Sequence, residues 1–501
     1  MSELGSVTPV FVRGEMVPQR PPPVHQPGVI GIIRQRLFNS PTNILLTIVG
    51  ALLLYFTVVP TLKFLLVDAV WSGSNRTDCL ADKAGHPVGA CWPFVQAKFS
   101  QFIYGFYPTP ERWRVDLVFA LGALLLAPLL IPRAPAKTLN AGLFFIAFPV
   151  LAFFLLYGGG VHGFGVTWSA NLLSGIADSV GHAGRKLAAG GPIGSVIGQA
   201  LLGLGTVLVW LSWPLVALRD WIQASSQPVW LDLLLTAVAV TALVFILTGV
   251  RNGWRALATT VGIFVGIAAM VAALRLDRGG LPVVDTRMWG GLLVTLVVSV
   301  TGIVASMPIG IALALGRRST IPLIRIFSVA FIEFWRGVPL ITVMFFATYM
   351  LPLFLPGNFT IDNLMRVLIG IALFAGAYNA EVIRGGLNAI PRGQAEAASA
   401  LGLSYWKTTG LIVLPQALRH VIPGLVNSFI ALFKDTSLVS IVALFDLLGQ
   451  LRAAFADPTW STPTTLFTGF AFTGLIYFVF CFGMSRYSLS VEHRLNAHRR
   501  T

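Results

Sequence analysis

The chain has 501 residues, of which 55% are hydrophobic and only 11% are charged. Its mean hydropathy is +0.78. Soluble globular domains carry about 25% charged residues, so this composition excludes that class. Many stretches approach the roughly 20 apolar residues that a membrane-spanning helix needs. We therefore expect an all-α polytopic membrane protein that is surrounded by membrane lipids.

The net charge of +15 could suggest a nucleic-acid partner, but the basic residues do not form a face with interleaved aromatic residues. They stand instead in short clusters between apolar segments, as expected for loops on the cytoplasmic side. Binding of nucleic acid is therefore excluded. The clusters comprise Arg34 with Arg36, Arg133 with Lys137, Arg317 with Arg318, and Arg494 with Arg499 and Arg500.

Eleven apolar segments are expected to be helices, because lipid offers the backbone no hydrogen-bonding partner. In chain order they are Ile44–Leu66, Val115–Ile131, Leu143–Tyr157, Val196–Leu218, Leu231–Val250, Ala256–Leu274, Trp289–Leu315, Val338–Leu355, Leu364–Tyr378, Val421–Leu448 and Leu466–Phe482.

Residues 1–43 form a basic, proline-rich lead, and the first apolar segment is too long for the apolar part of a signal peptide, so it is interpreted as an anchor. Residues 44–157 are expected to hold the amino-terminal membrane helices, with a long polar loop near 71–113 outside the cytoplasm. Cys79 and Cys91 flank part of this loop. Two free thiols and a disulfide are equally compatible with that position. No spacing of cysteine or histidine suggests a metal site.

The basic lead and the basic tail at 491–501 place both chain ends in the cytoplasm. Two ends on one side require an even number of crossings, whereas eleven segments are apparent. The weakly apolar stretch Val161–Val180, followed by Arg185 and Lys186, is the best candidate for another. We expect about twelve crossings.

The stretch from Ile321 to Leu355 is too long for one simple span, and Pro339 lies inside it. Because proline breaks or kinks a helix, we predict an amphipathic or broken helix followed by a crossing. Glu333 and Arg336 are three residues apart and could pair on one helix face.

A small, half-polar stretch interrupts the apolar pattern at residues 394–417. Its alanines favour a short helix over Gln394–Leu401, Gly402 stands where a left-handed residue ends a helix, and Ser404 could cap a second helix from Tyr405. The neighbouring Arg384, Arg392 and Lys407 indicate the cytoplasmic side. The stretch is predicted to be a cytoplasmic helix–turn–helix that docks another surface.

These residues carry a resemblance. Glu396-Ala397-Ala398, Gly402, Ile412 and Leu414-Pro415 match the EAA loop of the membrane subunits of ATP-binding-cassette importers. The runs at 331–340, 378–394 and 433–449 are similar to the polar amino-acid permeases of that class, and the M-type permease of general L-amino-acid importers is the nearest likeness. The resemblance is strong over 286–490, where it implies a permease core of five helices, and extends to the loop at 91–115. Residues 158–278, termed the insertion below, depart from it and have no assigned role.

The resemblance implies that the chain forms the path for amino acids and couples to a separate ATPase. The coupling residues would be Pro391, Arg392, Gly393, Glu396, Ala397, Ala398, Gly402, Ile412, Leu414 and Pro415, within a loop at 391–415. The implied partners are a cytoplasmic ATPase dimer, a second homologous permease and an extracytoplasmic amino-acid-binding protein, in a bacterial inner membrane.

The chain itself is not expected to be an enzyme, since it contains no Gly-Lys pair and therefore no P-loop. ATP would be bound by the partner subunit, and no cofactor is expected in this chain. The match of residues 158–163 to GxGxxG follows no strand and is interpreted as chance. No catalytic constellation is apparent.

Ionisable and polar groups within apolar segments are candidates for the translocation path. They are Glu333, Arg336, Asn379, Glu381, Lys434, Asp435 and Thr436. A cavity for zwitterionic amino acids would offer both signs of charge, as Lys434 and Asp435 do. Local structural pairing is the competing interpretation for each of them. Asn379 and Glu381 could equally anchor the coupling loop.

The rival hypothesis is a secondary amino-acid transporter driven by an ion gradient. Such carriers often contain inverted repeats with charges at the membrane midplane. No internal repeat is apparent in this sequence, and a carrier would have no use for the 394–417 stretch.

Overall fold

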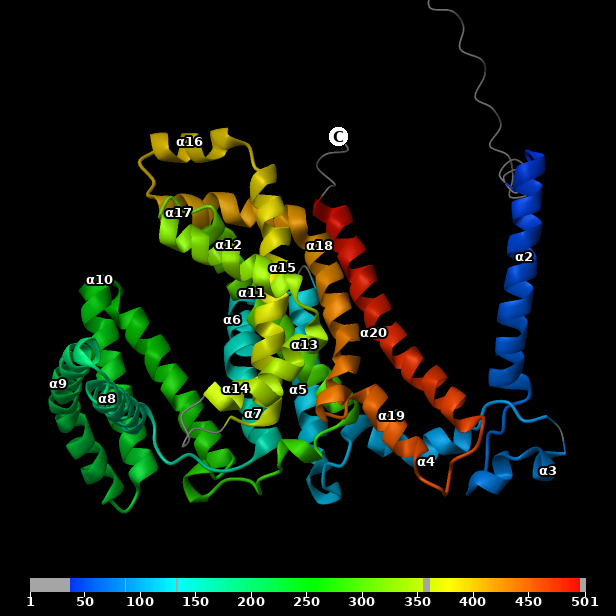
Figure 1. Ribbon diagram of the computed structural model, residues 1–501, viewed down its shortest axis with the longest axis horizontal. Helices are drawn as coiled ribbons and strands as arrows, with labels where there is room; N and C mark the ends of the chain where they lie inside the picture. The colour runs from blue at the N-terminus through cyan, green and yellow to red at the C-terminus, as the bar shows by residue number, and fades with distance from the viewer. Residues whose placement is uncertain (1–36, 86, 132–133, 355–360, 496–501) are drawn as a thin grey trace, which may run out of the picture. The chain divides into compact units, whose positions relative to one another are not determined.

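The computed structural model describes residues 37–85, 87–131, 134–354 and 361–495 (Figure 1). Within these ranges the chain is helical, and extended residues meet only in isolated bridges. The predicted all-α class is confirmed. Residues 1–36 of the lead and 496–501 of the tail lie outside the described part. Two compact units are distinguished, residues 1–94 with 459–468, and residues 95–458 with 469–501.

The first unit begins with the apolar helix α2 (Pro41–Leu62), which continues through a π-turn at Lys63–Val67. The Ser40 side chain accepts a hydrogen bond from the Asn43 N–H and so caps the helix. None of the α2 side chains is buried. A small lobe follows, with a 3₁₀ turn at Arg76–Cys79 and the short helix α3 (Ala81–Ala84).

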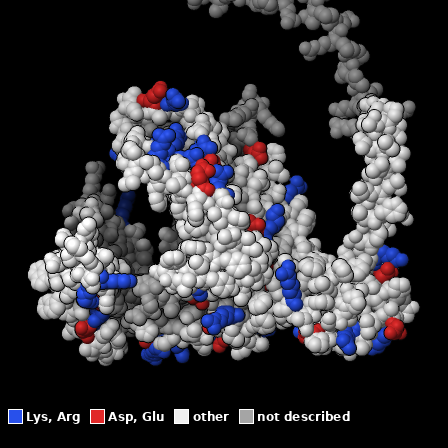
Figure 2. Space-filling model, viewed as in Figure 1, with Lys and Arg blue, Asp and Glu red and all other residues white. Residues whose placement is uncertain are grey.

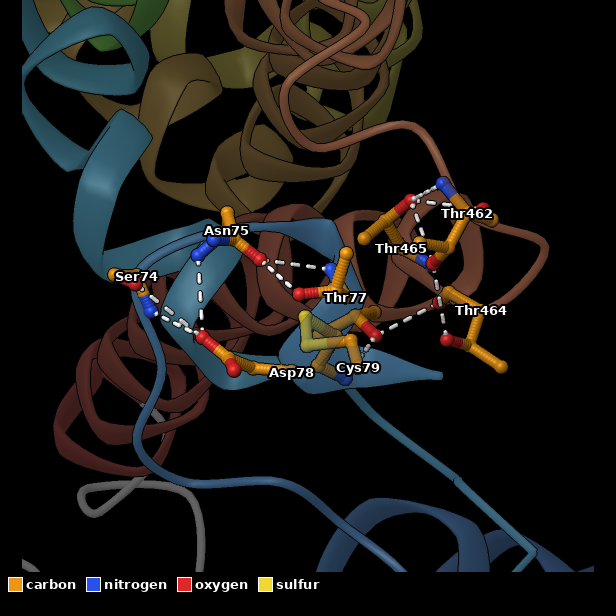
Figure 3. Close-up of a disulfide and its surroundings, with 10 residues drawn as sticks. Ser74, Asn75, Thr77, Asp78, Cys79, Thr462, Thr464 and Thr465 are labelled. Carbon is orange, nitrogen blue, oxygen red and sulfur yellow. Dashed lines mark hydrogen bonds between the residues drawn. A yellow bond between two sulfur atoms is a disulfide. The ribbon is translucent and has the colours of Figure 1, made fainter. Parts of the chain in front are cut away.

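A disulfide between Cys79 and Cys91 closes this lobe, with 5.7 Å between the Cα atoms (Figure 3). The Asp78 carboxylate pairs with Lys83 and accepts the Ser74 N–H at 2.7 Å. The pKa of Asp78 is lowered to about 2, and the hydrogen bond from Lys83 is the largest cause. The Cys91 N–H donates to Thr468 Oγ1 at 2.9 Å. The disulfide lobe is thus fastened to the threonine-rich segment Thr459–Thr468 of the same unit.

The second unit contains the remaining helices, although the first residues of α4 and of α20 belong to the first unit. Their bounds are α4 (Trp92–Tyr104, which starts in the first unit), α5 (Arg112–Leu130), α6 (Lys137–Gly142), α7 (Phe148–Tyr157), α8 (Gly165–Ala188), α9 (Pro192–Gln223), α10 (Pro228–Ala273), α11 (Gly291–Arg317), α12 (Pro322–Gly337), α13 (Leu340–Phe345), α14 (Leu351–Phe354), α15 (Asn363–Ala389), α16 (Arg392–Ala400), α17 (Tyr405–Thr408), α18 (Leu414–Asp435), α19 (Leu447–Phe455) and α20 (Thr465–Leu495). A π-turn joins α6 to α7, and α4 was not expected from the sequence.

Helices α11, α15 and α18 form the centre of this unit, and glycines allow their close approach. A Cβ atom on Gly310 of α11 would lie 3.2 Å from the Gly376 carbonyl oxygen of α15. A Cβ atom on Gly386 of α15 would lie 2.6 Å from the Ala417 carbonyl oxygen of α18. Larger residues at these two glycines would force the backbones apart.

Among the described residues, ten helices are long and apolar enough to cross a membrane, and one bent pair would make an eleventh. In that pair α12 and the segment from Leu340 to Phe354 meet at 104°, at the break predicted around Pro339. The predicted twelfth segment, Val161–Val180, is helical only from Gly165, where α8 begins. Helix α8 is not among the candidate spans.

The insertion consists of α8, α9 and α10. Helix α10 has 46 residues, but its Phe245 and Trp254 rings are only 6.1 Å apart. Nine residues of straight helix would separate them by about 13.5 Å along the axis. The helix therefore folds back on itself, and Figure 1 shows its two arms meeting at the α10 label.

The buried Asp232 side chain at the start of α10 holds the first turn of α8. Its carboxylate accepts the backbone N–H groups of Phe164 at 2.7 Å, of Val166 at 3.1 Å and of Thr167 at 3.1 Å. A carboxylate at a helix amino terminus satisfies donors that lack a partner within the helix.

Replacement of Asp232 by alanine is expected to destabilise the insertion by about 3 kcal/mol, because three backbone donors, one buried and two partly buried, would lose their acceptor. The measurement is thermal unfolding of the purified protein in detergent, with limited proteolysis between α7 and α8. Asp220→Ala is the matched control, since that side chain is 59% exposed on α9. Equal melting temperatures for the two variants would contradict this role of Asp232.

Candidate functional site

The coupling loop at 391–415 begins with α16, which ends in a tight left-handed turn. Gly402 has a φ of +77°. Its N–H donates to the Ser399 carbonyl at 2.9 Å, and the Leu403 N–H donates to the Ala398 carbonyl at 3.1 Å. This pair of bonds is the Schellman motif, in which glycine is favoured because a Cβ atom strains the left-handed conformation. The helix starts two residues earlier than predicted, at Arg392.

The second half of the loop is continuous with a membrane helix. Helix α17 passes through a π-turn at Thr409–Val413 directly into α18, which starts at Leu414-Pro415. Ser404 stands at the start of α17, but its side chain makes no capping hydrogen bond, so that prediction is wrong. Gln416 Nε2 donates to Gln394 Oε1 at 3.3 Å and ties α18 to α16. A force on α17 would therefore act directly on α18.

The loop exposes large apolar side chains that the sequence analysis did not single out. Leu401 is 79% exposed and Trp406 is 74% exposed, beside the exposed Tyr405 and Leu411. Glu396 and Ala397 are also exposed, whereas Ala398 is buried. A patch of apolar groups on a polar loop is typical of a protein-binding surface. In the sequence, the aromatic residues Tyr405 and Trp406 shortly after the alanine run could have indicated this binding surface.

A charge cluster ties three helices together close to this loop. Arg317, at the end of α11, donates to Glu381 of α15 at 2.7 Å and to Glu333 of α12 at 3.1 Å. Arg384 also donates to Glu381, at 2.8 and 3.0 Å. The predicted pairing of Glu333 with Arg336 is wrong, because Arg317 reaches Glu333 and Arg336 lies over the Tyr378 ring at 5.7 Å. Figure 2 shows basic and acidic side chains side by side on the surface in the region of α12 and α15.

The other translocation-path candidates lie at two separate places. Asn379 is 1% exposed, and its Nδ2 donates to Ser306 Oγ at 3.0 Å, which links α15 to α11. At the end of α18, Thr436 Oγ1 donates to the Phe433 carbonyl at 2.8 Å. Among the described residues, no ion pair within 4 Å joins Lys434 to Asp435. The contacts of these residues are structural, and a role in the path stays a prediction.

Asp446 is a buried acid that the sequence analysis missed. It accepts the Gly449 N–H at 2.9 Å and the Tyr477 hydroxyl at 3.0 Å, so it caps α19 and holds α20 against it. Burial raises the pKa of Asp446, while these hydrogen bonds act in the opposite direction. In the sequence, an aspartate directly before the apolar residues Leu447 and Leu448 could have indicated the amino-terminal cap of a helix.

The sequence of this chain is similar to those of known membrane transport proteins. Residues 306–496 match the model of the binding-protein-dependent transport system inner membrane component. The inner membrane amino-acid ABC transporter permease protein YhdY of Escherichia coli is 36% identical over 96% of this chain and 97% of its own length. The glutamate/glutamine/aspartate/asparagine transport system permease protein BztC of Rhodobacter capsulatus is 39% identical over 98% of this chain and 99% of its own.

The chain belongs to the amino-acid ABC transporter permeases. The predicted family, membrane class and transport function are thereby confirmed. Shorter permeases such as the glutamate/aspartate import permease GltK of Escherichia coli align with only 38% of this chain. A crystal structure of an amino acid ABC transporter is 28% identical, covers 41% of this chain and 92% of its own, and has a TM-score of 0.36.

Glu381→Gln in this permease is expected to cost about 2 kcal/mol of stability, because two arginines lose a mostly buried partner. Glu333→Gln should cost less than about 1 kcal/mol, since that side chain is 56% exposed. Thermal unfolding in detergent measures both variants. Equal losses would show that Glu381 is not the centre of the cluster.

Proposed function

We propose that this permease imports amino acids by coupling its membrane helices to a separate ATPase through the loop at 391–415. The observation that carries the proposal is the rigid helix–turn–helix around Gly402, which exposes Leu401 and Trp406. Exposed apolar side chains of this size are stabilised when a partner covers them. ATP is bound by that partner, and this chain has no ATPase site of its own.

The loop is built to pass a displacement into the membrane. Its first helix follows α15 after Pro391, and its second helix runs without a break into α18. These two membrane helices touch closely at Gly386 and Ala417, and Arg317 joins α15 to α11 and α12. A partner that binds the two loop positions differently before and after ATP hydrolysis would shift the helices together.

The remaining partners follow from the family. We propose a second homologous permease, an ATPase dimer, and an amino-acid-binding protein outside the membrane. The loop and both chain ends would face the cytoplasm, which the basic residues on either side of the loop favour. The Cys79–Cys91 disulfide favours an extracytoplasmic, oxidising environment for its polar loop.

Gly402→Asp is expected to abolish transport while leaving the protein inserted in the membrane. Aspartate tolerates the left-handed conformation, and no atom lies within 4 Å of the Cβ position, so the turn is retained. The added carboxylate would then be buried against the ATPase. The measurements are uptake of radiolabelled amino acids and co-purification of the ATPase.

Gly402→Asn is the matched control, since it has nearly the same size without the charge and should retain more of both activities. Normal uptake by Gly402→Asp would contradict the coupling role of the loop. If even the unmodified chain purifies without ATPase activity, the secondary transporter driven by an ion gradient becomes the preferred hypothesis.

A further inference from the structure

Helix α12 presents three faces of different chemistry, and the first of them packs on the protein. Ser328 and Ile332 are buried. Ile332 belongs to a hydrophobic cluster that includes Leu313 of α11 and Ile383 of α15. This packing fixes how α12 is turned about its own axis, so the directions of its other two faces are set.

The second face of α12 is apolar and exposed. Leu323, Phe327 and Phe334 are 77%, 62% and 63% exposed. Their spacing of four and seven residues places them within about 40° of one another around the helix. They point about 140° away from the buried Ser328 and Ile332. These three residues are called the apolar stripe.

The third face of α12 carries the charged residues. Arg325 and Arg336 lie within about 20° of each other around the helix, and about 170° from the middle of the apolar stripe. Glu333, the one acid of α12, accepts a hydrogen bond from Arg317 at 3.1 Å. Among the described residues, no carboxylate lies within 4 Å of Arg325 or Arg336. This face therefore has an excess of positive charge.

The bend after α12 sets the direction of this helix relative to the membrane. Helix α12 and the segment from Leu340 to Phe354 meet at 104°. That segment contains no charged residue, whereas α12 contains three. Because charges are costly in hydrocarbon, the uncharged segment is the part that enters the membrane core. Helix α12 then lies close to the membrane plane, and Figure 1 shows it running across the bundle.

A helix in the membrane plane with one apolar and one cationic face has the arrangement of interfacial helices, whose apolar face enters the boundary between headgroups and acyl chains. We propose that α12 binds anionic phospholipids of the cytoplasmic leaflet, with the apolar stripe among the acyl chains and Arg325 on a lipid phosphate. The choice of leaflet rests on the orientation proposed above for the loop at 391–415, whereas the depth of α12 does not.

The opposite directions of the two exposed faces favour a bilayer over a protein partner. A single protein helix that covered the apolar stripe would leave Arg325 facing away from it. A bilayer contacts both faces, because its acyl chains and phosphates lie at different depths. Charge complementarity selects anionic lipid, since each arginine near such a surface strengthens attachment by about fivefold. Arg318, just before α12, adds positive charge, and its guanidinium donates to the Leu387 carbonyl and not to a carboxylate.

The depth of α12 is measured with a spin label on the full chain in bilayers of phosphatidylcholine and phosphatidylglycerol. The background variant is Cys481→Ser, which removes the free thiol. Phe327→Cys carries the label, and Leu401→Cys in the loop is the matched control, since that apolar side chain is 79% exposed. We expect the label at 327 to collide with dissolved oxygen and to be shielded from a water-soluble nickel chelate. The label at 401 should show the reverse.

Two results of this measurement would overturn the proposal. Ready access of the nickel chelate to position 327 would show that α12 lies in water. Shielding of position 327 from both reagents would show that protein, such as a second copy of the chain, covers the apolar stripe. Failure of the proposed function would appear in the uptake assays instead, which this measurement does not use, so the two failures are distinguishable.

Arg325→Gln tests the contact with the lipid headgroup. A fluorophore on Leu323→Cys, in the same Cys481→Ser background, is quenched by phospholipids with brominated acyl chains. We expect stronger quenching by brominated phosphatidylglycerol than by brominated phosphatidylcholine, and Arg325→Gln should lower this preference by about fivefold. Arg278→Gln is the control, since that exposed arginine lies outside α12, and it should leave the preference unchanged. Equal quenching by the two lipids in the unsubstituted background, or an unchanged preference in Arg325→Gln, would refute the anionic contact.

Discussion

The structure depends on one constraint, that backbone groups in lipid must find their hydrogen-bonding partners within the chain. Helices meet this requirement, and the described residues are helical almost throughout. Two departures from regular helix show how the chain meets this requirement where the helix stops. At the break between α12 and α13, Pro339 has no N–H to satisfy. At the end of α16 the Schellman bonds of Gly402 and Leu403 satisfy the last carbonyls. The same constraint makes these interruptions the places where function can reside.

The charge cluster fixes the ends of the helices that support the loop at 391–415. Glu381 lies about two helical turns before the end of α15. Arg384 shares the Glu381 carboxylate with Arg317 from α11. An isolated charge at this boundary would be costly, but each member here has an opposite charge within reach. The cluster therefore fixes the ends of α11, α12 and α15 relative to each other. The loop then has a stiff support, and its movement is not absorbed by fraying of the helix ends.

Local features were predictable from the sequence and distant contacts were not. The alanine run and Gly402 identified α16 and its end, and Pro339 identified the break, because both depend on neighbouring residues. Glu333 was paired with Arg336 in the prediction because they are close in sequence, yet Arg317 reaches it from sixteen residues away. Asp232 was missed for the same reason, and so was the contact of Asp446 with Tyr477, which lies 31 residues away. Asp232 holds Phe164 across 68 positions, and no periodicity reveals such a partner.

The insertion leaves and re-enters the permease core at a single point. The Gly159 N–H donates to the Leu281 carbonyl at 2.8 Å, and the Val284 N–H donates to the Tyr157 carbonyl at 2.8 Å. A Cβ atom on Gly158 would lie 2.3 Å from the Pro282 oxygen, so glycine is needed where the two ends meet. This explains the glycine run that resembled a nucleotide-binding fingerprint. Because its two ends already touch, α8–α10 are attached to the core at one place.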